Sequence, residues 1–140
     1  MNLIVDSNVL FTFFWKNSVS RKLFTDQELE LHSPAFALEE IKTHTNEIMS
    51  KTKLTREQFE SIKKQLSTLV NFINLETYAT FLKEACTITP DQNDVDFIAL
   101  SLKLKCPIWS NDHALTQQDK CRIFTTKEII ELISEKDRIQ

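Results

Sequence analysis

The alternation of apolar and polar positions predicts strands and helices that follow one another along the whole chain. Five short apolar or alternating runs have the length of strands, and most are bounded by polar residues or proline. The first run, L-I-V at residues 3–5, is apolar without interruption, as is typical of a strand buried on both faces. The expected strands are residues 3–5, 28–32, 70–75, 107–109 and 122–125.

The segments between these strands carry apolar residues at helical spacing. Ser33 is expected to cap a helix that Pro34 opens, with Phe36 on its packed face. Thr55 and Gln58 have the spacing of a capping box at the start of a later helix. The expected helices are residues 7–15, 18–26, 34–49, 53–69, 76–86, 90–105 and 126–135, with a short one after residue 112.

Strands that alternate with helices favour a parallel sheet covered by helices on both faces. The expected fold is therefore α/β, a three-layer α/β/α sandwich with a central parallel sheet. Its first strand should lie in the middle of the sheet. The length of 140 residues fits a single domain over residues 1–140, and no linker or internal repeat divides it.

The amino-acid composition argues against several kinds of binding site. The chain contains no glycine, which excludes Gly-rich phosphate loops of the dinucleotide or P-loop kind. Three cysteines without C-x-x-C spacing are expected to be reduced, packed thiols, and a zinc site is improbable. The net charge of −3 speaks weakly against a broad basic surface. Without an apolar run long enough to span a bilayer or a basic leader, we expect a cytoplasmic protein that does not enter the membrane.

Several acids stand at the ends of predicted elements. Asp6 and Asp112 each follow an apolar strand, so parallel strands should bring both to one edge of the sheet. Asp94 lies at the start of a buried helix, and Glu40 lies near the first turn of its own helix. Carboxylate clusters without sulfur or imidazole suit Mg²⁺ or Mn²⁺, which would offset the repulsion between like charges. Asp91 or Asp96 could serve as an additional ligand, although Asp96 lies about 200° round the helix from Asp94.

With those residues placed, the sequence resembles the PIN domain family of metal-dependent nucleases, which includes VapC-like ribonucleases. Four segments carry the resemblance, and they occur in order over almost the whole chain. They are L-I-V-D-S-N-V-L around Asp6, S-P-A-F-A-L-E-E-I around Glu40, D-Q-N-D-V-D-F-I-A-L-S-L around Asp94 and P-I-W-S-N-D around Asp112.

The resemblance implies that Asp6, Glu40, Asp94 and Asp112 form the catalytic and metal-binding set. It matches Asn8 to a polar residue that supports the first aspartate, and Ser110 to a hydroxyl before the last one. Glu39 competes with Glu40 for its position, although the acid directly before the apolar Ile41 fits better. The implied activity is Mg²⁺- or Mn²⁺-dependent hydrolysis of phosphodiester bonds, with single-stranded RNA as substrate.

The resemblance also implies partners and alternatives. The protein is expected to be an endoribonuclease that could be the toxin of a toxin–antitoxin pair, with an antitoxin protein as a partner and a homodimer as a family-based expectation. The alternative from another class is a catalytically inactive PIN-like module that binds nucleic acid or protein. A phosphotransferase of the aspartyl-phosphate type fits less well, because Asn8 stands where a second acid is normally needed.

Basic and aromatic side chains could also contribute to nucleic-acid binding. An approach for a polyanion could be lined by seven basic residues, although ordinary solvated charges are the simpler interpretation; they are Lys16, Arg21, Lys22, Lys42, Lys51, Lys53 and Arg56. The aromatic run F-T-F-F-W at residues 11–15 has helical spacing beside the first strand. It therefore predicts core or dimer packing rather than base stacking.

Overall fold

The computed structural model describes residues 1–139 and contains a five-stranded, fully parallel sheet. The strand order is β3-β2-β1-β4-β5, so the first strand lies in the centre as its composition predicts. The bounds are β1 Asn2–Val5, β2 Glu30–Pro34, β3 Val70–Ile73, β4 Ile108–Trp109 and β5 Ile123–Phe124.

Helices connect every pair of consecutive strands. The bounds are α1 Ser7–Thr12, α2 Val19–Leu23, α3 Phe36–Thr43, α4 Thr45–Thr52, α5 Arg56–Leu69, α6 Leu75–Tyr78, α7 Leu82–Ile88, α8 Val95–Leu104 and α9 Thr126–Ile139. Three 3-10 turns complete the described part of the chain: η1 Ala79–Phe81, η2 Gln92–Asp94 and η3 His113–Gln117.

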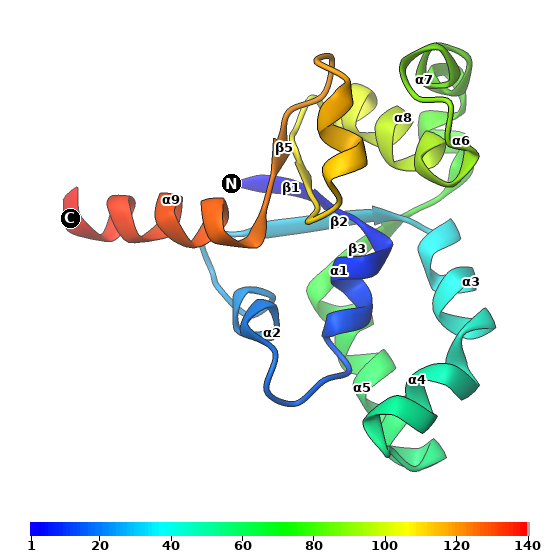
Figure 1. Ribbon diagram of the computed structural model, residues 1–140, viewed down its shortest axis with the longest axis vertical. Coiled ribbons are helices and arrows are strands. Elements are labelled where there is room, and N and C mark those ends of the chain that lie inside the picture. Colours follow the sequence, from blue (N-terminus) through cyan, green and yellow to red (C-terminus); the bar gives the residue numbers. More distant parts are fainter. Residues whose placement is uncertain (140) are drawn as a thin grey trace.

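The sheet separates two layers of helices (Figure 1). In the view of Figure 1, α1, α2 and α5 lie below the sheet, whereas α6, α7 and α8 lie above it. Helix α8 contacts three strands, β1, β2 and β4, which explains why residues 97–101 are buried. The expected α/β/α sandwich with a central parallel sheet is confirmed.

The strand order changes direction between β1 and β4. From β1 the chain adds β2 and β3 on one side, and then returns to add β4 and β5 on the other. In open α/β sheets, the crevice beyond the carboxyl ends of two such strands is where ligands bind. In this chain those ends are Asp6, after β1, and the segment 110–112, after β4.

The predicted start of the helix at Pro34 is wrong. Ser33 and Pro34 belong to β2, and α3 begins only at Phe36. Pro34 is tolerated there because its nitrogen would face β1, which has already ended at Val5. The Ser33 hydroxyl does not cap α3 but donates to the Val5 carbonyl oxygen at 3.0 Å. Phe36, expected to be packed, is exposed because the first turn of α3 projects beyond the sheet.

Two segments expected to be single helices are broken. The helix expected over residues 34–49 is interrupted at His44, where the Thr45 hydroxyl bonds the Ile41 and Lys42 carbonyl oxygens. Such side-chain bonds compete with the helical ladder. The helix expected over residues 76–86 is divided by a 3-10 turn after Tyr78. The capping box of Thr55 and Gln58 is present as predicted.

The cysteines are free thiols, but not all of them are packed in the core. All three cysteines are free, and Cys106 and Cys121 are buried, but Cys86 is exposed rather than packed.

Within residues 1–139, none of the helices combines the length and apolar character needed to cross a bilayer.

The centre of the sheet should dominate stability. Ile4 is fully buried and pairs with His32 of β2 and Ile108 of β4. Ile4→Ala should therefore lower the free energy of unfolding by about 2–5 kcal/mol in urea titrations. The control Val19→Ala, at an exposed position, should change it by less than about 0.5 kcal/mol. Equal effects of the two substitutions would contradict the position of β1 at the centre.

Candidate active site

Asp6 is the most buried carboxylate of the site, with 6% of its surface exposed. It follows β1 directly and stands before the first turn of α1 as its N-cap residue. Its side chain does not cap the helix but turns to β4, where Oδ2 accepts a hydrogen bond of 2.7 Å from the Ser110 hydroxyl. Burial raises the pKa of Asp6, which the Ser110 and Ser7 hydrogen bonds partly offset and the charge of Asp112 raises further.

The Ser110 hydroxyl joins the ends of the two central strands. It donates to Asp6 and at the same time accepts the Asp112 backbone N–H at 3.0 Å. Its own backbone N–H is bound by the Phe124 carbonyl oxygen of β5, and the residue is 1% exposed. Ser110 therefore links Asp112 to Asp6, from which Ser110 itself is 104 residues distant in the sequence.

Glu40 reaches the same edge from α3. Its Oε1 accepts a hydrogen bond of 2.6 Å from the hydroxyl of Ser7, the residue after Asp6. Burial raises the pKa of Glu40, the Ser7 hydrogen bond lowers it, and the nearby charge of Asp6 raises it. Glu39 is exposed on the other side of α3. Of the two glutamates weighed from the sequence, it is thus Glu40 that lies beside Asp6.

Asp94 completes the group from the other layer of helices. It stands directly before α8 as the N-cap residue, and its side chain makes no capping hydrogen bond. Burial raises the pKa of Asp94 to about 6, together with the charges of Asp91, Asp6, Asp112 and Glu40. Asp91 belongs to the same 3-10 segment as Asp94, whereas Asp6, Asp112 and Glu40 come from three other segments. Their charges all raise the Asp94 pKa, so Asp94 belongs electrostatically to the same negatively charged region.

Asp112 and Asn8 lie at the solvent side of this region. Asp112 is exposed, and its Oδ1 accepts the Ala114 backbone N–H at 3.0 Å. Asn8 is exposed in the first turn of α1 and lines a hollow that also includes Glu40. Within residues 1–139, the side-chain hydrogen bond to Asp6 comes from Ser110 and not from Asn8.

Asp96 accepts a hydrogen bond from Tyr78 that the sequence does not predict. The hydroxyl of Tyr78, which is 1% exposed, donates a short hydrogen bond to Asp96 Oδ2. Burial, this hydrogen bond and the charge of Asp96 keep the Tyr78 pKa far above its usual range. Asp96 also acts electrostatically on Glu40. A tyrosine at the end of the short helix α6 gives no sequence signal for such a partner, because α6 and α8 meet only in the folded chain.

The fit to a divalent cation can be tested on these residues. The donors are carboxylates, and nearby like charges help to raise the pKa of Asp6, Glu40 and Asp94. None of the four acids takes part in the ion pairs found in the described part of the chain. Donor type and charge therefore suit Mg²⁺ or Mn²⁺. Among residues 1–139, however, no three acidic, His or Cys side chains already lie close enough to form a ligand cage. The region fits a cation in chemistry without being preformed around one.

Comparisons with known proteins show the family and the fold of the chain. The chain matches the PIN domain family over residues 4–132, and it belongs to that family. Its fold is similar to that of a chain in the crystal structure of VapBC2 from Rickettsia felis bound to a DNA fragment from their promoter. The TM-score is 0.68 at 14% sequence identity, and the match covers 89% of this chain and 98% of that one. None of the curated proteins matches the sequence.

The charge on Asp94 should weaken the metal-free protein at neutral pH. Because its folded pKa of about 6 lies above the ordinary 3.8, the folded state holds this proton more tightly than the unfolded chain. That contribution is present below about pH 4 and is lost as the pH rises through 6. In EDTA, Asp94→Asn should therefore melt at a higher temperature than the parent at pH 7.5, with little difference at pH 4.

The control for this measurement is Asp119→Asn, which removes one exposed acid outside the site. It should show the same melting difference from the parent at both pH values. An Asp94→Asn protein that melts with the parent at pH 7.5 would contradict the crowding of negative charge around Asp94.

Proposed function

We propose that the protein is a metal-dependent endoribonuclease that hydrolyses phosphodiester bonds of single-stranded RNA. The observation that carries this proposal is the convergence of Asp6, Glu40, Asp94 and Asp112 at the strand-order reversal of a PIN domain. These acids come from four separate segments and lack a cationic side chain as partner among the described ion pairs.

Each acid has a proposed part in the reaction. Asp6 and Asp94 hold one Mg²⁺ or Mn²⁺, and Glu40 and Asp112 complete that site or a second one. A bound divalent ion lowers the pKa of a water molecule and stabilises charge on the phosphate. Ser110 and Ser7 are positioning residues, since their hydroxyls hold the Asp6 and Glu40 carboxylates. A serine or histidine nucleophile is not required.

The proposed partners follow from the substrate and the family. RNA is the substrate, and an antitoxin protein is a proposed partner, because the similar fold is that of a chain in a VapBC2 structure. The protein would then act as the toxin of the pair. A homodimer is proposed on the family resemblance alone. Three free cysteines are consistent with the reducing cytoplasm, which we propose as the compartment.

The second candidate function is a PIN-like module that binds nucleic acid or protein without cleaving it. One observation favours it: the acids do not form a ready ligand cage among residues 1–139. The presence of acids at all four matched positions speaks against it. The two functions differ in a single readout, which is cleavage.

Cleavage of a fluorescent single-stranded RNA in Mn²⁺ tests the proposal. The parent should cut the RNA, and EDTA should stop the reaction. Asp6→Asn should lower the rate by about 100-fold or more, because loss of a metal ligand removes several kcal/mol of transition-state stabilisation. Asp119→Asn is the matched control and should keep the parent rate. RNA that is bound but left intact by the parent would establish the binding module instead.

A further inference from the structure

A hollow that we call the aromatic groove is lined by residues of α1, α3 and α4 and by the residues between them, among them Glu40 of the acidic set. It lies between α1 with the following turn and α3–α4, and has a volume of about 400 Å³. Asn8 and Glu40 stand at its end next to the acids, whereas Trp15 comes from the turn that follows α1. Since Glu40 belongs to both, any molecule in this groove also reaches the candidate active site.

The walls of the aromatic groove suit a flat, uncharged ring with polar edges. Trp15 is 36% exposed, although its neighbours Phe13 and Phe14 are buried in the core. Across the groove, the rings of Phe11 and His44 meet edge to face with centroids 5.6 Å apart. The carboxylate of Glu47 is compensated, because Lys51 donates to it at 2.7 Å and His44 lies at 3.1 Å. These are the features of a surface on which a nucleobase stacks.

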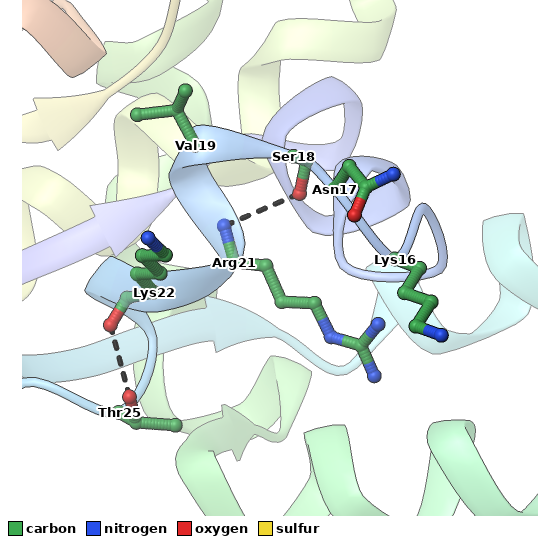
Figure 2. A pocket seen from close by; sticks show the side chains of 7 residues that line it. All are labelled: Lys16, Asn17, Ser18, Val19, Arg21, Lys22 and Thr25. Carbon is green, nitrogen blue, oxygen red and sulfur yellow. Dashed lines mark hydrogen bonds between the residues drawn. The ribbon is translucent and has the colours of Figure 1, made fainter.

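A second hollow begins at the next residue of the chain. This basic pocket has a volume of about 420 Å³ and is lined by Lys16, Arg21 and Lys22 among others. Figure 2 shows that Lys16 and Arg21 extend toward the same side, while the amine of Lys22 lies on the other. Lys16 and Arg21 also line the adjoining hollow against α5, where the one acid is Glu57.

The cations of this pocket are available to a ligand. The four ion pairs of the described chain involve none of Lys16, Arg21 and Lys22. The Arg21 guanidinium lies over the Phe13 ring at 5.2 Å, which fixes its direction without neutralising it. In a protein with a net charge of −3, this is a local concentration of positive charge. An anion is the ligand that such a site selects.

We propose that single-stranded RNA follows α1 from the acidic edge to the basic pocket. One base stacks on Trp15 in the aromatic groove, and the backbone phosphates beyond it bind Lys16 and Arg21. The order of chemical groups along α1 carries this inference: acids for a metal and the scissile phosphate, then aromatic rings, then unpaired cations. It rests on the proposed ribonuclease function, and it assigns to Trp15, Lys16 and Arg21 the binding of RNA outside the reacting atoms.

We call this path along Trp15, Lys16 and Arg21 the RNA track. Equilibrium binding of fluorescein-labelled single-stranded RNA in EDTA tests the track without cleavage. Lys16→Gln/Arg21→Gln should bind more weakly, and its plot of log affinity against log salt should be less steep by roughly 1.4 for two lost phosphate contacts. Lys103→Gln/Lys120→Gln is the matched control, because it removes the same charge from exposed lysines that do not line the track. It should keep the parent slope.

Trp15 supplies an independent readout. Trp15→Ala should weaken RNA binding about fivefold or more, whereas Trp15→Phe should retain most of the affinity because a ring remains for stacking. RNA should quench the tryptophan emission of the parent but not of Trp15→Phe, in which only the fully buried Trp109 remains. Melting curves of each variant verify that it is folded.

The outcomes separate the track from the proposed function. If the parent cleaves RNA in Mn²⁺ but all variants bind RNA with parent affinity and salt slope, the track is wrong and the ribonuclease stands. That result is also expected if a second copy of the chain or another protein occupies the groove. If the parent neither binds nor cleaves RNA, both proposals fail.

Discussion

The hydrogen bond from Ser110 to Asp6 is the contact on which the candidate site depends. It joins the two central strands at the point where the strand order reverses, and the same hydroxyl accepts the Asp112 backbone N–H. The Asp6 backbone N–H also donates to the Trp109 carbonyl oxygen at 3.0 Å, so Ser110 adds a side-chain link to the main-chain link between β1 and β4. Because hydrogen bonds to ionised groups are stronger than neutral ones, a buried serine at this place stabilises the charged form of Asp6. A parallel sheet with β1 at its centre makes the contact geometrically possible.

Several carboxylates are crowded together at the carboxyl edge of the sheet. Burial and neighbouring acids raise the pKa of Asp6, Glu40 and Asp94 together, so the folded chain carries an unfavourable concentration of negative charge. A bound divalent ion, as proposed, would offset that cost. The aromatic groove and the basic pocket extend away from this edge along α1, so the acidic and basic surfaces are separated along one helix. Net charge alone therefore says little about nucleic-acid binding here.

Much of the fold was predictable because it depends on short-range patterns. The L-I-V run of β1 and the capping box at Thr55 each carry a local signal that the structure keeps. The errors arose where strand pairing or a single side-chain hydrogen bond overrides the local pattern. Pro34 ends β2 rather than opening a helix because β1 has already stopped, and the break at His44 follows from the Thr45 side chain. Glu40, which the sequence favours over Glu39 because it precedes the apolar Ile41, accepts the hydrogen bond from Ser7. The bridge through Ser110 and the Tyr78–Asp96 bond could not be predicted, because each joins residues from separate elements.

The central claim is that acids distant in sequence share one divalent cation. Anomalous diffraction from crystals of the parent protein soaked in Mn²⁺ tests it directly. A peak bonded by the carboxylates of Asp6 and Asp94, and absent from Asp6→Asn crystals treated in the same way, is the result we predict. Saturating Mn²⁺ that leaves this edge empty, or a peak bonded only by acids elsewhere on the chain, would contradict it.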